Sequence, residues 1–72
     1  EILINHLKDF RLKQSRREGI APYLIFNNAQ MDDLIAKMPH TPDELLKVSG
    51  FGITKVNKYG ESILKILWEF TS

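Results

Sequence analysis

The sequence predicts an all-α protein, folded as a compact bundle of five short helices. Apolar residues recur at three- and four-residue intervals through most of the 72 residues, which is the spacing of one helix face. Residues that end helices divide this pattern at Gly19, Pro39, Gly50 and Gly60. Only residues 20–26 resemble a strand, and a lone strand would leave its backbone groups unsatisfied. We therefore interpret that run as an apolar connector packed across the core, which can include one turn of 3₁₀ helix.

The first helix is predicted over residues 2–18, and Gly19 is its expected C-terminal stop. Its apolar stripe consists of Leu3, Leu7 and Phe10. Gln14 takes the next position of that stripe, where an apolar residue was expected. Asn27 and Asn28 are predicted to cap a second helix, which Pro39 ends. The apolar stripe of that helix consists of Met31, Leu34, Ile35 and Met38.

The third helix begins at a strong start signal. Thr41 is the expected cap, Pro42 suits the first helical position, and Glu44 is expected to complete a capping box. This helix should run through Val48 and stop at Gly50. A fourth helix is predicted over residues 53–59, stopped by Gly60, and a fifth over residues 61–70. The fifth should turn Ile63, Ile66, Leu67 and Phe70 inward and place Trp68 at a margin.

The segment Gly50-Phe51-Gly52 has the pattern of a helix-hairpin-helix turn. Both glycines permit a positive φ, so the chain can reverse direction there while Phe51 points into the core. Such a turn can present backbone N–H groups to a phosphate, as a helix start does. It can equally be a corner between packed helices. We expect the second role, and keep Gly50 and Gly52 as candidate backbone contacts to a phosphate.

Composition excludes several classes of protein. A chain of 72 residues makes one small domain, and its 43% of apolar residues suits a globular fold rather than a disordered one. It has no cysteine, and its two histidines lack partners at metal-site spacing, so we expect no disulfide, metal or cofactor. There is no signal peptide and no apolar run of the roughly 20 residues that a membrane span needs. An intracellular monomer is expected, cut from a longer chain because Glu1 is not Met.

No pattern of catalytic residues is present in the sequence. The acidic residues fall at predicted helix starts or on exposed faces, where capping and the helix dipole account for them. Asp32 and Asp33 are adjacent, so on a helix they point about 100° apart and do not converge. There is no phosphate loop of the Walker type either. We predict no catalytic residue.

Nucleic-acid binding needs cations that follow a phosphate backbone and exposed rings on which bases stack. Three features qualify: an aromatic ring in the connector, cations at the end of the first helix, and two lysines that share a face after the Gly-Phe-Gly turn. The residues are Tyr23; Lys13, Arg16 and Arg17; and Lys55 and Lys58. The alternatives are a half-buried tyrosine, a solvated face for the lysines and, for the arginines, a favourable interaction with the helix dipole.

Taken in order, these segments resemble the helicase-and-RNase-D-C-terminal (HRDC) domain, which is SAM-like in fold. The resemblance runs from about Leu3 to Phe70. It depends on residues 22–29 (Pro-Tyr-Leu-Ile-Phe-Asn-Asn-Ala), Met38-Pro39, residues 41–46 and Val48-Ser49-Gly50-Phe51-Gly52, followed by Lys55, Tyr59 and Gly60. It implies a five-helix accessory domain of a RecQ-type ATP-dependent DNA helicase. RNase D-like exonucleases carry the domain too.

The resemblance also implies partners. In several members the domain binds single-stranded or branched DNA weakly, and in others it serves contacts with protein or with the rest of the helicase. Tyr23 matches the connector aromatic that contacts DNA in bacterial members, and Lys55 and Lys58 match basic positions. Two residues depart from the family pattern. Gln14 replaces an apolar residue and is expected to loosen that end of the core, and Asn28 replaces a frequent Asp and is expected to cap. The resemblance places the protein in the bacterial cytoplasm or, in a eukaryote, the nucleus.

Overall fold

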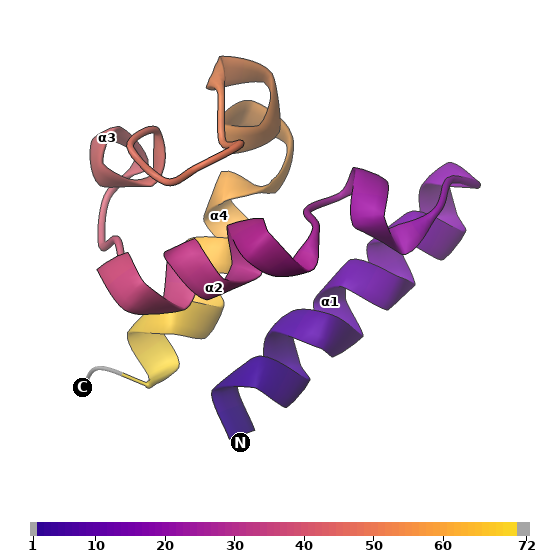
Figure 1. Cartoon of the computed structure of the whole chain (residues 1–72), viewed down its shortest axis with the longest axis horizontal. Coiled ribbons are helices and arrows are strands. Elements are labelled where there is room, and N and C mark those ends of the chain that lie inside the picture. The colour runs from indigo at the N-terminus through magenta and orange to yellow at the C-terminus, as the bar shows by residue number, and fades with distance from the viewer. Residues whose placement is uncertain (1, 71–72) are drawn as a thin grey trace.

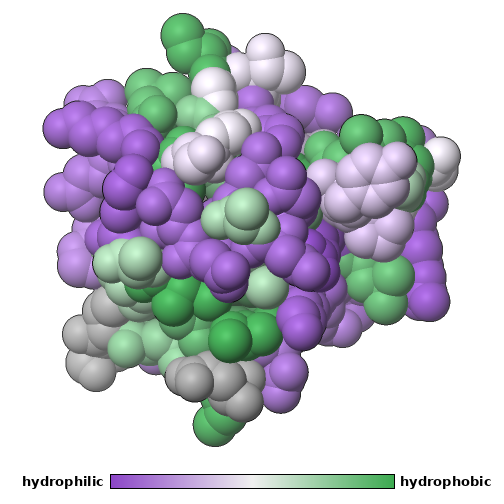
Figure 2. All heavy atoms as spheres, viewed as in Figure 1, coloured by the Kyte–Doolittle hydropathy of each residue, from purple (hydrophilic) through white to green (hydrophobic). Residues whose placement is uncertain are grey.

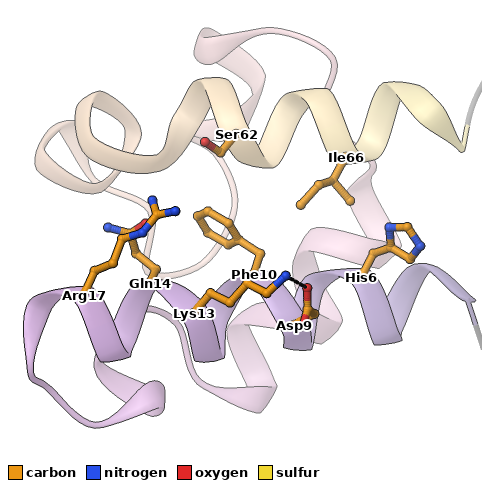
Figure 3. Close-up of a pocket in the computed structure, with 8 residues that line it drawn as sticks. All are labelled: His6, Asp9, Phe10, Lys13, Gln14, Arg17, Ser62 and Ile66. Atoms are coloured by element: carbon orange, nitrogen blue, oxygen red, sulfur yellow. Dashed lines mark ion pairs between the residues drawn. The ribbon is translucent and has the colours of Figure 1, made fainter.

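The computed structural model describes residues 2–70 and confirms the all-α fold, with no strand among those residues. It has four α-helices and one short 3₁₀ helix, rather than five helices (Figure 1). In chain order these are α1 (Ile2–Glu18), η1 (Pro22–Leu24), α2 (Asn28–Lys37), α3 (Pro42–Leu45) and α4 (Ile53–Glu69). The two long helices, α1 and α4, lie side by side and run in opposite directions (Figure 3). No helix within residues 2–70 has the length and apolar character to cross a membrane.

The hydrophobic core draws on the four α-helices, on the connector after η1 and on the turn before α4. Its fully buried side chains include Leu7 of α1, Leu34 of α2, Leu45 of α3 and Ile63 and Leu67 of α4. The connector after η1 adds Ile25 and Phe26, also fully buried, so the predicted connector enters the core only at its end, while Ile20, Tyr23 and Leu24 are exposed. The turn before α4 adds Phe51, whose ring centroid lies 6.0 Å from that of Phe26. Two segments that each look locally irregular are therefore held together by their aromatic rings.

The predicted break at Gly60 is wrong, because α4 continues through this residue without interruption. Gly60 is buried, and its backbone is helical. A glycine inside a helix costs roughly 1 kcal/mol relative to alanine, which does not end a helix whose flanking residues pack well. Here Val56, Tyr59, Ile63 and Leu64 all contribute to the core on either side of it.

Replacing Gly60 with Ala is therefore expected to stabilise the protein by about 0.5–1 kcal/mol, because it removes conformational freedom from the unfolded chain. The added Cβ would lie 3.4 Å from Val56 Cγ1 and 3.7 Å from Leu45 Cδ2, which is ordinary contact. Urea denaturation would measure the change. Gly19→Ala is the matched control: no atom crowds that position either, but its φ of +69° should make the substitution destabilising. A loss of stability in Gly60→Ala would contradict the continuous helix.

The helix ends agree with the sequence in part. Gly19 ends α1 as predicted, with the Ile20 N–H donating to the Ser15 carbonyl at 3.0 Å, the bond of a Schellman motif. α2 ends at Lys37, and its C-cap residue Met38 has a positive φ of 43°; Pro39 follows directly. Asn27 caps α2 in a capping box with Gln30.

Four details of the prediction were wrong. Asn28 does not cap, because it is already the first residue of α2. Glu44 does not close a box on Thr41: its carboxylate accepts from the His40 N–H at 2.7 Å, one residue earlier. The third helix ends at Leu45 instead of Val48, and it is followed by turns in which backbone N–H groups donate to carbonyls three residues earlier. Phe70 is 37% exposed rather than inward, because it follows the last turn of α4, where its ring meets that of His6 with 5.2 Å between centroids.

Candidate nucleic-acid interface

The end of α1 meets the first half of α4 at Glu18. Its carboxylate accepts three hydrogen bonds, from Gln14 Nε2 at 3.0 Å, Lys58 Nζ at 3.0 Å and the Tyr59 hydroxyl at 2.5 Å. Lys58 also lies 5.3 Å from the centroid of the Tyr59 ring. The contacts to Lys58 and Tyr59 join residues that are 40 and 41 positions apart in the sequence. Glu18 therefore connects the two long helices.

These hydrogen bonds shift the acid–base equilibria of the cluster. Those from Tyr59, Gln14 and Lys58 lower the pKa of Glu18 to about 2 because they stabilise the carboxylate. The same contact with Glu18 raises the pKa of Lys58. Burial, followed by the hydrogen bond to Glu18, raises the pKa of Tyr59. At neutral pH Lys58 is therefore charged, but its nearest partner is a carboxylate rather than solvent.

Lys55 occupies a different environment, although it is only one turn away from Lys58. Its ammonium lies 5.9 Å from the centroid of the Phe51 ring and 3.5 Å from Gln30 Oε1. Burial lowers its pKa. The two lysines that the sequence placed on one face are thus each drawn to their own partners, and neither is simply a solvated side chain.

Of the three cations predicted to bind at the end of α1, one is ion-paired and two are not. Lys13 forms an ion pair with Asp9 at 3.0 Å, one turn earlier. Arg16 and Arg17 are exposed in the last turn of α1, and neither joins an ion pair among residues 2–70. These two arginines are therefore open to an anionic partner, as well as suited to the helix dipole.

Tyr23 is 66% exposed on η1, so its ring is not the half-buried one of the alternative interpretation. The 3₁₀ turn beginning at Pro22 points Tyr23 and Leu24 outward while Ile25 and Phe26 enter the core. Figure 1 shows η1 beside the last turns of α1. In Figure 2, apolar residues stand at this end of the molecule beside pale and hydrophilic ones. The aromatic ring and the exposed arginines thus occupy the same end of the fold.

The two glycines of the hairpin turn have different roles. Gly50 has a φ of +80°, and the side chain of Gln30 fills the space where a Cβ would stand. This glycine serves the packing of the corner. At Gly52 no atom lies within 4 Å of the place that a Cβ would take, and this residue begins α4 without a side-chain cap. The first N–H groups of α4 have no partner within the helix, so of the two only Gly52 lies at an open helix start.

Sequence reasoning missed two residues that position this interface. Arg11 Nη1 donates to the Phe26 carbonyl at 3.1 Å and to Asn28 Oδ1 at 3.0 Å, with its guanidinium 5.6 Å from the centre of the Phe26 ring. It holds the connector after η1 and the start of α2 against α1. Glu18 is the second. No local spacing in the sequence could have identified either residue, because their partners are distant in the chain.

The acidic residues do not converge. Asp33 accepts from the Ser49 N–H at 2.8 Å and from Lys37 at 2.9 Å, and the hydrogen bond from Ser49 lowers its pKa. It ties α2 to the turn before Gly50, which is a structural role. Within residues 2–70 no three His, Cys, Asp or Glu side chains are grouped as metal ligands.

The fold and this interface define a small all-helical domain with an aromatic and cationic end. Residues 1–67 match the HRDC domain family. The chain is 34% identical to ATP-dependent DNA helicase Q-like 4B of Arabidopsis thaliana over 92% of its length, and 30% identical to ATP-dependent DNA helicase RecQ of Bacillus subtilis over 88%. It superimposes on D. radiodurans RecQ HRDC domain 3 with a TM-score of 0.88 and 31% identity, covering 94% of this chain and 90% of that one.

The chain belongs to the HRDC domain family. It is an accessory, non-catalytic domain of the kind carried by RecQ-type DNA helicases, as the sequence resemblance implied. It spans 6% of the Arabidopsis relative and 11% of the Bacillus one, so the motor activity in those names belongs to proteins much longer than this domain.

Proposed function

We propose that this domain binds single-stranded or branched DNA weakly, within an intracellular ATP-dependent helicase, and holds the strand near the motor. The observation that carries the proposal is the exposed Tyr23 ring at the same end of the fold as Arg16 and Arg17. A base can stack on the ring while the guanidinium groups meet neighbouring phosphates. The relatives' names, which describe DNA helicases, support a nucleic-acid partner.

The number of available cations limits the affinity. Lys13 and Lys58 have carboxylate partners, and Lys55 is drawn toward Phe51, so each must give up a contact to reach a phosphate. Arg16 and Arg17 need give up none. Each phosphate neutralised contributes about 0.7 to the salt slope of binding to a single strand, so few contacts mean weak binding with a shallow salt slope. The open start of α4 at Gly52 could add one backbone contact to a phosphate.

Titration of labelled single-stranded DNA at low salt tests the proposal. Tyr23→Ala should weaken binding roughly tenfold, because stacking one base on an aromatic ring contributes about 1–3 kcal/mol. Tyr23→Phe should retain it. Arg16→Ala and Arg17→Ala should each weaken binding and lower the salt slope by about 0.7. Lys47→Ala removes an exposed cation near α3 and serves as the matched control. Absence of wild-type binding at millimolar protein, or an equal loss in Lys47→Ala, would refute the proposal.

A second candidate is a docking module for protein, either the rest of a helicase or another chain. The acidic residues Asp32, Asp43 and Glu44 are exposed, and Ile53 is 69% exposed at the start of α4. Exposed carboxylates and an exposed apolar side chain suit a protein partner better than DNA. The substrate-binding domain of an RNase D-like exonuclease is a related alternative. Amide shifts at Asp32 and Asp43 on adding the remaining parent chain would support docking, and shifts confined to Tyr23 and α1 would count against it.

A further inference from the structure

A groove of about 330 Å³ separates α1 from α4, near the cationic end of the molecule (Figure 3). Phe10 points from α1 toward α4, and Ile66 points from α4 toward α1, while Ser62 lines the groove from α4. Gln14 and Arg17 lie at one end, toward the C-terminus of α1. A volume at the small end of the range for ligand sites suits one ring system rather than an extended molecule.

The floor of this groove is apolar. Phe10 and Ile66 are both partly buried and pack against the core, and the Phe10 ring centroid lies 6.2 Å from that of Tyr59. Tyr59 in turn is fixed by its hydrogen bond to Glu18. The floor is therefore held in place by the core residues that it packs against, which lowers the entropic cost of packing a flat ring on it.

The rim is polar, and its hydrogen-bonding groups suit a heteroaromatic ring. Gln14 uses Nε2 to donate to Glu18, which leaves its Oε1 as an acceptor. The Ser62 hydroxyl can donate or accept. A family member with an apolar residue in place of Gln14 would lack this acceptor. The departure from the family pattern therefore changes the chemistry of the groove.

The charges at the rim favour an anionic strand. Asp9 is matched by Lys13 at 3.0 Å, so the pair adds no net charge. Arg17 has no ion pair among residues 2–70 and supplies the unbalanced positive charge at the end nearest Arg16. A ligand that combines a flat ring with an adjacent phosphate matches this arrangement of floor, rim and charge.

We propose that the groove between α1 and α4 holds one unstacked base of a single-stranded nucleic acid, packed on Phe10 and Ile66, with its neighbouring phosphate on Arg17. This inference rests on the proposed DNA binding and adds to it a second base contact besides Tyr23. The strand then runs from η1 across the last turn of α1 into the groove.

Two strands with the same number of phosphates, one bearing bases and one abasic throughout, test the inference. The Tyr23→Ala variant lacks the ring on η1, so any remaining preference for the base-bearing strand must come from another site. We expect this variant to bind the base-bearing strand roughly tenfold more tightly than the abasic strand. Adding Ser62→Leu to the Tyr23→Ala variant fills the groove without changing the charge. It should reduce the ratio of the two affinities, base-bearing over abasic, to about one. Asn5→Leu, an exposed polar residue of α1 outside the groove lining, is the matched control and should leave the ratio unchanged.

A measurement on the unmodified protein guards against variants that fail to fold. The amides of Gln14 and Ser62 should shift when the base-bearing strand is added and not when the abasic strand is added. Equal shifts with an oligoglutamate peptide of matching charge would indicate a site for acidic protein and overturn the inference. So would a ratio of one in Tyr23→Ala alone. If neither strand binds at all, the proposed DNA binding has failed, which is a different result.

Discussion

Replacing Gly50 with Ala is expected to lower the free energy of unfolding by about 2–3 kcal/mol. A residue with a Cβ pays roughly 1–2 kcal/mol at a left-handed φ, and the φ of Gly50 is +80°. The new Cβ would also overlap the side-chain amide of Gln30, so the Gln30 side chain must move. That side chain accepts from the Asn27 N–H in the capping box of α2, and losing one hydrogen bond costs about 1 kcal/mol. Thermal unfolding should show a midpoint lower by roughly 10–20 °C.

A double-mutant cycle with Gln30 separates the two causes. In a Gln30→Ala background the obstructing side chain is absent, so Gly50→Ala should cost only the roughly 1–2 kcal/mol of the positive φ. Gly52→Ala is the control, because its φ of −85° is ordinary and no neighbouring atom is close; it should cost less than about 1 kcal/mol. Costs that simply add in the double mutant would show that Gln30 does not fill the space beside Gly50.

Replacing Glu18 with Gln is expected to strengthen the proposed binding of single-stranded DNA. The substitution keeps the shape of the side chain but removes the negative charge that pairs with Lys58 at 3.0 Å. Lys58 could then meet a phosphate, and the salt slope should steepen by about 0.7. Glu61→Gln changes the net charge by the same amount without releasing Lys58, so it should leave the slope unchanged. Equal effects of the two substitutions would show that only net charge matters.

Glu18→Gln should also change how stability depends on pH. The pKa of Glu18 lies near 2 in the folded protein, below the ordinary value of 4.5. The carboxylate therefore contributes stability above about pH 4.5, and this contribution is lost as the pH falls toward 2. Urea denaturation between pH 7 and pH 2 should show the wild type more stable than the variant at the upper end, with the difference disappearing at the lower end. A difference that persists at pH 2 would argue against the charge of Glu18 as its cause.

Local signals in the sequence were enough to locate most elements. Gly19, Pro39 and the Thr41-Pro42 start all act within a few residues of their own positions, so their effect could be predicted without knowing the fold. Gly60 shows where this reasoning fails. A glycine ends a helix only when leaving the helix lowers the free energy of the chain. Here the core contacts on both sides of Gly60 keep α4 intact.

The candidate interface was predictable in its residue types but not in its pairings. Exposed cations and an exposed aromatic ring were expected, and Arg16, Arg17 and Tyr23 are exposed. The partners of the two lysines were not foreseen, because Lys58 reaches Glu18 across 40 positions and Lys55 reaches Gln30 across 25. Side-chain spacing along a helix says which residues share a face, and it does not say what the face meets.

For this protein, the sequence by itself determined the all-α class, the starts of the four α-helices and the family, because all of these depend on periodicity and on residues acting locally. Only the tertiary structure decided that α4 is one helix, that Gly50 packs against Gln30, and that Glu18 holds Lys58 beside Tyr59. The reason is physical: each of these depends on atoms brought together by packing of the core, and hydrogen bonds and steric contacts act over a few ångströms regardless of distance along the chain.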